Sequence, residues 1–139
     1  MSTIFSQIVE GEIPARVVYE DETTIAFLDA NPLAPGHTLV VPKDEYERLN
    51  NVPDDVATDL YATIHRLTPA IEEAVDADAT TVAFNNGEAA GQEVPHVHCH
   101  IVPRFEGDDA GPIHSAFGGP EAIPDDELDE IAEAIESRA

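Results

Sequence analysis

The sequence predicts an α+β domain with a mainly antiparallel, five-stranded sheet. Short β-favouring runs follow one another with brief turns between several of them, and one long amphipathic segment interrupts the series. The length of 139 residues suits a single core, and the chain has no internal repeats and no long linker. We therefore expect one domain over residues 1–139.

Five runs rich in Val, Ile, Thr, Phe or Tyr are the expected strands, at residues 16–19, 24–28, 37–41, 80–84 and 96–103. The acidic residues 20–22 predict a hairpin turn between the first two strands, and Pro42 is expected to end the third. Strands that follow one another through short turns favour antiparallel pairing.

Three helices are expected around these strands. A short one covers residues 3–10 and is ended by Gly11. The longest begins near Pro53 and carries an apolar stripe at steps of three and four residues, formed by Val56, Leu60, Ile64, Leu67, Ile71 and Val75. The last is capped by Asp125, and we expect it to bury an apolar edge of Leu128, Ile131 and Ile135.

The chain is strongly acidic. It contains 29 Asp and Glu against 6 Lys and Arg, a formal net charge of −23. This charge repels nucleic-acid backbones and anionic lipid, so we expect neither nucleic acid nor a membrane as partner. Self-repulsion of this size calls for screening, and in molar salt the Debye length is only about 3 Å. The composition therefore predicts a halophilic protein from a high-salt cytoplasm.

Cysteine usage and hydropathy agree with a cytoplasmic location. Cys99 is the only cysteine, which excludes an intramolecular disulfide and any Cys-x-x-Cys pair. No apolar run approaches the roughly 18–20 residues that span a bilayer, and the chain does not open on a secretory signal pattern.

The chemically informative segment is residues 95–103, where His96, His98 and His100 alternate with apolar residues. Alternate side chains on a strand share a face, so the three imidazoles are expected on one side and the intervening residues in the core. The preceding Gly-rich residues 87–92 could supply backbone N–H donors to an anion bound there.

Two chemistries fit such an arrangement. Alternating histidines suit a Zn²⁺ site, although no Asp or Glu alternates with them to orient the ligand nitrogens. The other possibility is a nucleophilic imidazole that attacks phosphorus. His98 is best placed for this, because each neighbouring imidazole can bind phosphoryl oxygens or protonate a leaving group.

Residues 96–102 resemble the His-φ-His-φ-His-φ-φ signature (φ apolar) of the histidine-triad (HIT) nucleotide-binding proteins. Further matching segments follow in the family's order, at residues 3–5, 13–15, 26–29, 35–43 and 91–92. The resemblance covers about residues 3–103, which leaves residues 104–139 as a C-terminal extension. It implies an HIT-like fold, a homodimer, no cofactor, and hydrolysis or transfer of nucleotides at an α-phosphate through a nucleotidyl-histidine intermediate.

The resemblance also implies roles for individual residues. His98 is the nucleophile, oriented by the backbone carbonyl of His96, while His100 and His37 complete the pocket around the phosphate and leaving group. The implied nucleotide-binding residues are Asp29 for the ribose, Asn85 and Gln92 for phosphate oxygens, and Ile4, Phe5, Ile8 and Phe27 for the base. Taken without the resemblance, Asp29 is a turn acid and the four apolar residues are ordinary core.

The chain departs from the family pattern in two places. Many microbial relatives hold a structural zinc with a Cys-x-x-Cys pair in the first helix and a His after the Pro-Lys pair. Here the corresponding residues are Thr3, Ser6 and Glu45, so we expect no metal. Glu93 stands where relatives often place a Ser or Thr that donates to phosphate, and its carboxylate opposes phosphate at that position.

The favoured function is a nucleotide phosphoramidase or hydrolase that acts on AMP or GMP conjugates. An alternative from another class is a nucleotide-binding regulatory module with vestigial activity, and diadenosine polyphosphate hydrolysis is an alternative within the enzyme class. The intact triad together with His37 favours the enzyme, because a binding module needs no nucleophile.

Overall fold

The computed structural model describes residues 2–139 and divides the chain into two compact units, one up to Asp108 and one over Asp109–Ala139. The first unit continues past the expected end of the core at residue 103. The last strand runs to Arg104, whose Nε donates to Asp108 Oδ2 at 2.8 Å and holds the following turn. The assignment of residues 1–139 to one domain stays a prediction, and each unit is described separately.

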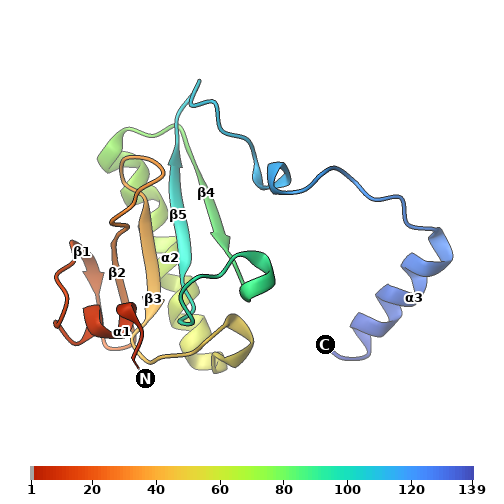
Figure 1. Cartoon of the computed structure of the whole chain (residues 1–139), viewed down its shortest axis with the longest axis horizontal. Helices are drawn as coiled ribbons and strands as arrows, with labels where there is room; N and C mark the ends of the chain where they lie inside the picture. Colours follow the sequence, from red (N-terminus) through yellow and green to blue (C-terminus); the bar gives the residue numbers. More distant parts are fainter. Residues whose placement is uncertain (1) are drawn as a thin grey trace. The chain divides into compact units, whose positions relative to one another are not determined.

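A five-stranded antiparallel sheet forms the first unit within the described residues, in the order β1-β2-β3-β5-β4 (Figure 1). The α+β class and the antiparallel pairing expected from the sequence are confirmed. The strands are β1 (Val17–Glu20), β2 (Thr24–Leu28), β3 (Thr38–Pro42), β4 (Ala79–Phe84) and β5 (Cys99–Arg104).

The bounds of every strand except β2 differ from the expected ones by one to three residues. Pro42 is itself the last residue of β3, so the strand ends at this proline as expected. It pairs with Thr24 at a position with no β5 partner, so the ladder loses no donor. β5 begins at Cys99 rather than at His96. The backbone N–H groups of His96 and Val97 donate to Val94 and Tyr46 in loops, which removes both residues from the ladder.

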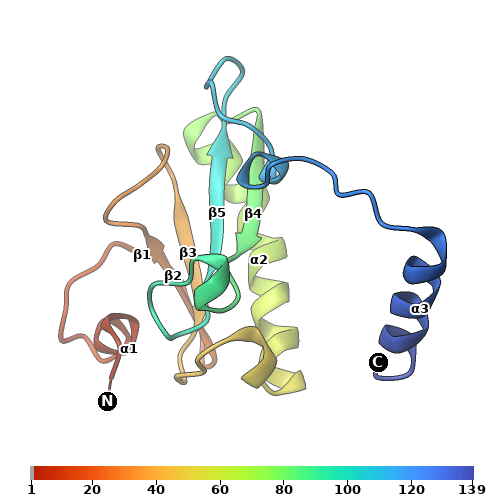
Figure 2. The same ribbon diagram turned by 45° about the vertical axis from the view of Figure 1, so that its right-hand side comes forward.

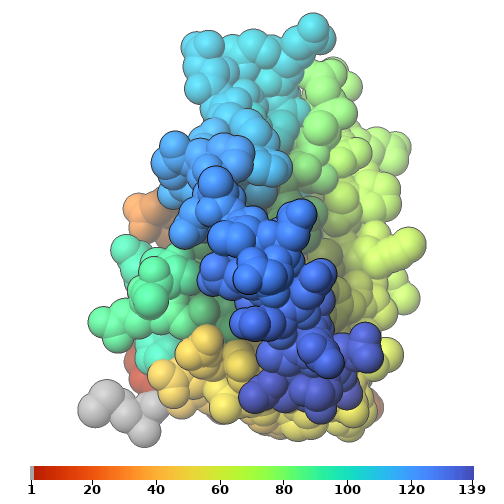
Figure 3. Space-filling model, turned by 90° about the vertical axis from the view of Figure 1, so that its right-hand side faces the viewer, coloured from red at the N-terminus to blue at the C-terminus, as the bar shows by residue number. Residues whose placement is uncertain are grey.

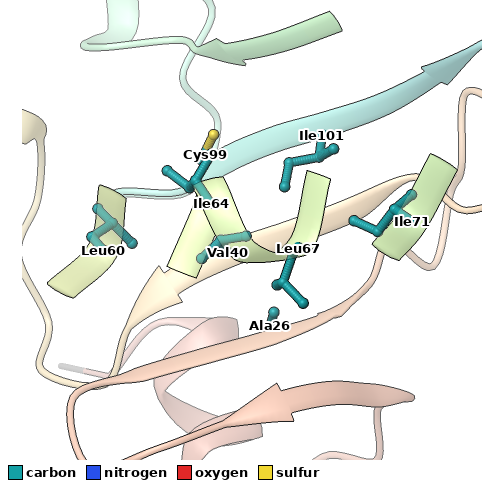
Figure 4. Packing of buried hydrophobic residues seen from close by; sticks show 8 residues of the cluster. All are labelled: Ala26, Val40, Leu60, Ile64, Leu67, Ile71, Cys99 and Ile101. Atoms are coloured by element: carbon teal, nitrogen blue, oxygen red, sulfur yellow. The ribbon is translucent and has the colours of Figure 1, made fainter. Parts of the chain in front are cut away.

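Helix α2 (Asp54–Val75) runs along one face of the sheet (Figure 2). Its apolar stripe meets the inward side chains of β2, β3 and β5. Figure 4 shows the resulting core of Ala26, Val40, Leu60, Ile64, Leu67, Ile71, Cys99 and Ile101. Burial raises the pKa of the Cys99 thiol to about 12, so this cysteine is a small apolar filler behind the histidines.

The opposite face of the sheet carries the short helix α1 (Ile4–Val9). Phe5 of this helix is buried against a second cluster of Ile25, Phe27, Leu39 and Val41. His100 pairs with Leu39 across β3 and β5, so its side chain lies on this same face. The functional site is therefore built on the α1 side of the sheet.

Gly36 shapes the loop that leads into β3. Its φ is +90°, and a Cβ at this position would lie 2.9 Å from Val75 Cγ1, so only glycine fits. This close approach of the loop to the end of α2 fixes the chain just before His37. Three short 3₁₀ turns complete the helices: η1 (Leu49–Asn51), η2 (Glu88–Ala90) and η3 (Ile113–Ala116).

The second unit contains η3 and helix α3 (Asp125–Glu136), whose surface is drawn in blue in Figure 3. Two expectations for this helix are wrong. Pro124 is the N-cap and Asp125 is already helical. The expected apolar edge of Leu128, Ile131 and Ile135 is exposed, because this unit has no second element large enough to cover it.

No helix within residues 2–139 is both long enough and apolar enough to cross a membrane.

Candidate functional site

A cleft of about 760 Å³ opens on the α1 side of the sheet. This volume lies in the range of small-molecule sites. His98 and His100 line its wall, Asp29 lies on its rim, and α1 supplies apolar side chains. All of these residues belong to the first unit.

His98 presents one free ring nitrogen at this cleft. Its Nδ1 lies 2.8 Å from the backbone carbonyl oxygen of His96. A carbonyl can only accept, so Nδ1 carries the proton and Nε2 of the neutral ring keeps its lone pair. The residue is 9% exposed, which leaves that nitrogen shielded from bulk water but within reach of a ligand in the cleft.

His96 is completely buried and is held by both ring nitrogens. Its Nε2 donates to the carbonyl of Pro42 at 2.8 Å, and its Nδ1 accepts from Thr3 Oγ1 at 3.0 Å. Burial lowers the pKa of His96, although the Pro42 carbonyl and the Glu45 carboxylate oppose this shift. The ring is therefore a neutral, fixed support for the backbone carbonyl on which His98 rests.

His37 and His100 form a chain of neutral imidazoles. The backbone N–H of Leu33 donates to His37 Nδ1 at 3.0 Å, which leaves the proton on His37 Nε2. That nitrogen lies 2.9 Å from His100 Nδ1 and donates to it, so the proton of His100 is on Nε2. His100 consequently carries an N–H donor beside His98, with the two ring centroids 5.0 Å apart.

Burial keeps the His37 and His100 rings uncharged. It lowers the pKa of His37, and together with the neighbouring His98 and His37 it lowers the pKa of His100 to about 4. The Asp29 carboxylate acts in the opposite direction on both rings. Near neutral pH these two histidines thus act through N–H donors rather than through positive charge.

Asp29 lies beside His37 because the end of the β2–β3 ladder joins them. The backbone N–H of Asp29 donates to the His37 carbonyl at 2.9 Å. Its Oδ1 accepts from the backbone N–H of Asn31 at 2.9 Å, while Oδ2 lies 3.6 Å from His37 Nε2. The loop thus fixes the carboxylate on the rim of the cleft, where it can accept hydrogen bonds from hydroxyl groups.

The apolar part of the cleft contains all four residues expected to meet a base, namely Ile4, Phe5, Ile8 and Phe27. The rings of Phe5 and Phe27 lie 5.6 Å apart. Phe5 also meets His98 edge-on, with the ring centroids 4.9 Å apart. The apolar end of the cleft and the candidate nucleophile are therefore in direct contact.

Of the two amide side chains expected at the phosphate, one lines the cleft and the other does not. Asn85 lines the cleft. Gln92 does not, because its Oε1 accepts from the Gly87 N–H at 2.7 Å and its Nε2 donates to the carbonyls of Glu47 and Val94. In this structure the Gln92 amide braces the Gly-rich loop.

One charged residue of the cleft, Arg16, was not assigned to its lining from the sequence. Arg16 is the one Lys or Arg that lines it within the described residues. Arg104, the Lys or Arg nearest to the three histidines in the sequence, does not line it. Arg104 is instead bonded to Asp108 and Thr81. Glu93, which the sequence pattern placed at the phosphate, also lines the cleft. Arg16 is 82 positions before His98 in the chain, so no local pattern could have indicated it.

The donor groups do not favour a metal. Ligand atoms of Asp29, His37 and His100 lie within 4.8 Å of one another. However, His37 Nε2 carries the proton that the Leu33 N–H forces onto it, so its lone pair is not offered to an ion. Around His96, Thr3 and Ser6 supply hydroxyls, which zinc rarely takes as ligands.

The model of the HIT domain matches residues 10–107. An uncharacterized HIT-like protein of Methanocaldococcus jannaschii is 50% identical over 76% of this chain and 81% of its own length. An adenylylsulfatase of Arabidopsis thaliana is 39% identical, over 76% of this chain and 53% of that protein. An adenosine 5'-monophosphoramidase of Candida albicans is 36% identical, over 74% and 70%.

Solved structures of other proteins have a similar fold. The crystal structure of an HIT family protein from Bacillus subtilis has a TM-score of 0.84 with 34% sequence identity, and the match covers 100% of this chain and 98% of that one. The HIT-like fold expected from the sequence is therefore confirmed.

Proposed function

The chain belongs to the HIT domain family, and we propose that it hydrolyses the bond between an amine and the α-phosphate of a purine nucleotide through a nucleotidyl-His98 intermediate. The observation that carries this proposal is the tautomer of His98, whose Nδ1–H is bound to the His96 carbonyl while Nε2 is left with a lone pair at the cleft. Relatives with this domain include a phosphoramidase and an adenylylsulfatase.

The proposed reaction is a double displacement. His98 Nε2 forms a bond to the α-phosphorus as the phosphorus–nitrogen bond of the substrate breaks, and the amine leaves after taking a proton from water. A second water then attacks the same phosphorus and gives a proton to the hydroxide that the first water left. The bond to His98 breaks, and nucleoside monophosphate leaves. Two inversions give net retention of configuration at phosphorus.

The surroundings of His98 suit the charge that develops during this reaction. The His98 ring becomes positive once its Nε2 is bonded to phosphorus, and its Nδ1–H then makes a charge-assisted hydrogen bond to the His96 carbonyl. The Nε2–H of His100 can donate to a phosphoryl oxygen, and Arg16 adds the cation of the cleft lining. Asp29 is assigned to the ribose hydroxyls, and the apolar side chains around Phe5 to the base.

Phosphoramidates are favoured over dinucleoside polyphosphates as substrates because of the charges in the cleft. Glu93 and His98 line the same cleft, and Arg16 is the single Lys or Arg of the lining in residues 2–139. A polyphosphate leaving group adds negative charge beside that carboxylate, whereas an amine leaving group adds none.

Replacement of the nucleophile tests this function. We expect His98→Ala to lower turnover of an adenosine phosphoramidate by about a thousandfold or more, because the covalent step is lost. AMP binding and the thermal unfolding midpoint should stay close to those of the wild type. The control is His65→Ala, which removes an exposed histidine of α2. Near wild-type activity in His98→Ala refutes the assignment.

We also propose that the chain forms a homodimer through the edge of β4. This strand lies at one end of the sheet, and its residues, Ala79–Phe84, include no charge and no proline in a chain with 29 acids. Exposed edges are normally protected by charge, so an uncharged edge favours pairing with a second copy. Val82 on this strand is 44% exposed, and Tyr61 on α2 is also exposed.

The working environment that we propose is a high-salt cytoplasm. The net charge of −23 opposes both the compact fold and the approach of a phosphate-bearing substrate. Dissolved salt screens both effects, since the Debye length falls from about 10 Å at 0.1 M to about 3 Å at 1 M.

A further inference from the structure

Thr3, Ser6, Glu45 and His96 form a hydrogen-bonded group, here called the α1–His96 cluster. Glu45 Oε1 accepts from the Thr3 backbone N–H at 2.9 Å and from Ser6 Oγ at 2.6 Å. Thr3 Oγ1 lies 3.0 Å from His96 Nδ1. The cluster thus ties the start of α1 and the segment after β3 to a fully buried histidine.

The direction of each bond in the cluster is fixed. The Ser6 backbone N–H donates to Thr3 Oγ1 at 3.1 Å as part of the α1 N-cap, and Thr3 O–H donates in turn to His96 Nδ1. That nitrogen must accept, because the proton of the ring is on Nε2, which donates to the Pro42 carbonyl. Both ring nitrogens of His96 are therefore held, one from α1 and one from the end of β3.

This anchoring matters because the sheet does not hold residue 96. β5 begins at Cys99, and the His96 N–H donates to the loop carbonyl of Val94. The His96 carbonyl that accepts from His98 Nδ1 at 2.8 Å thus lies outside the ladder. The residue is held by its side chain, through the cluster and Pro42, together with its backbone hydrogen bond to the neighbouring loop.

We propose that Thr3, Ser6 and Glu45 are positioning residues for the reaction, which fix the His96 carbonyl and through it the orientation and tautomer of the His98 ring. This inference rests on the proposed function. None of the three residues lines the cleft that contains His98, so they act without touching the substrate. Their hydrogen bonds connect the start of α1, the segment after β3 and His96.

Paired substitutions at Thr3 test the proposal. Thr3→Val removes the hydroxyl with little change in shape, and Thr3→Ser keeps it. We expect Thr3→Val to lower kcat for an adenosine phosphoramidate about tenfold with KM unchanged within twofold, because a misplaced nucleophile reacts more slowly while the binding surface is intact. Thr3→Ser should restore kcat. The control is Thr58→Val, which removes a hydroxyl that donates to the Asp54 carbonyl at an exposed position of α2. It should leave kcat unchanged.

A second pair of variants, at Glu45, tests the proposal even if Thr3→Val does not fold. Glu45 is exposed, so Glu45→Ala should fold, and it should lower kcat in the same way. Glu45→Gln keeps the accepting Oε1 and should retain kcat. If Thr3→Val and Glu45→Ala both fold and keep kcat within twofold of the wild type, the proposal is wrong.

Ring ¹⁵N spectra of the ligand-free protein separate this inference from the proposed function. We expect wild-type His98 to show the Nδ1–H tautomer, and Thr3→Val to show a mixture of tautomers or exchange broadening at His98. Unchanged His98 shifts in Thr3→Val contradict the positioning role. If instead the shifts change but the wild type neither turns over phosphoramidates nor forms an adduct, the proposed function fails while the structural link from Thr3 to His98 stands.

Discussion

In the proposed reaction His98 attacks an anion in a protein of charge −23, and its neighbours assist without carrying full positive charge. His96 offers a carbonyl to Nδ1, and His100 offers an N–H from a ring whose pKa is held at about 4. Neutral donors fixed in a buried site stabilise developing charge without having to reorganise during the reaction. The direction of each hydrogen bond is therefore more informative here than the number of histidines.

The protonation state of His100 gives a direct test at this scale. A free imidazole has a pKa of about 6.5, and burial beside His98 and His37 lowers that of His100 to about 4. In a ring ¹H–¹⁵N titration at high salt, His100 should remain neutral from pH 7 to pH 5 and titrate near pH 4. A midpoint near 6.5 contradicts the neutral state inferred for His100 from the hydrogen bonds that join Leu33, His37 and His100.

The same shift makes stability depend on pH in a definite direction. Below about pH 6.5 the unfolded chain protonates this histidine, whereas the folded chain does not until about pH 4. The contribution of His100 to the free energy of unfolding is therefore present in full above pH 6.5 and decreases as the pH falls toward 4. In His100→Gln this part of the pH dependence should be absent from denaturant unfolding curves.

Asp29 is expected to recognise the ribose. Asp29→Asn weakens an acceptor of two hydroxyl groups, so we expect AMP to bind about tenfold more weakly. Calorimetry with 2',3'-dideoxy-AMP supplies the control, because that ligand lacks both hydroxyls and should bind wild type and variant equally. An equal loss for both ligands assigns Asp29 to the structure of the loop instead.

The candidate residues differ in how far the sequence could indicate them. The alternation of three histidines is a local pattern, so the sequence alone indicates His98. The four apolar residues expected to meet the base lie together in the cleft, namely Ile4, Phe5, Ile8 and Phe27. Arg16 and the Thr3–His96 contact depend on residues 82 and 93 positions apart, which no local pattern encodes. Gln92 belongs to a matching motif, yet its amide binds backbone groups of its own loop and of Glu47.

At the scale of elements, β4 and β1 are the two edges of the sheet within the described residues, and they differ in charge. β1 contains Glu20, which pairs with Lys43 at 2.7 Å, whereas β4 contains no charged residue. Val82→Asp on β4 should convert a dimer to a monomer in light scattering after gel filtration at high salt. Val18→Asp, on exposed β1, is the matched control and should remain dimeric.

A wild-type chain that is already monomeric under those conditions contradicts the homodimer. If instead Val18→Asp dissociates and Val82→Asp does not, the interface lies at the other edge of the sheet.

The predicted boundaries of elements were wrong where carbonyls of loops, rather than of a neighbouring strand, accept the backbone N–H groups. Alternation alone extends the last strand back to residue 96, but loop carbonyls accept the N–H groups of His96 and Val97. Helical periodicity correctly marked α2, whose stripe meets the sheet. The same periodicity predicted a buried edge for α3, but spacing shows only that a helix has an apolar face and not what covers it.

For the whole molecule, charge repulsion is the dominant consequence of composition. We expect the thermal unfolding midpoint and kcat/KM for a phosphoramidate both to rise between 0.1 and 3 M KCl, because screening weakens self-repulsion and the repulsion of substrate. An uncharged osmolyte such as sucrose is the control for general stabilisation and should not raise kcat/KM. Greatest stability in dilute buffer refutes the halophilic assignment.

The covalent intermediate is the central claim, and trapping it is the most direct test. The protein is mixed with an adenosine phosphoramidate at high salt, quenched with base within one turnover, and digested for mass spectrometry. The account predicts an added AMP group on the peptide that contains His98 and none in His98→Ala. Rapid turnover by the wild type with no adduct, or an adduct on another residue, contradicts it.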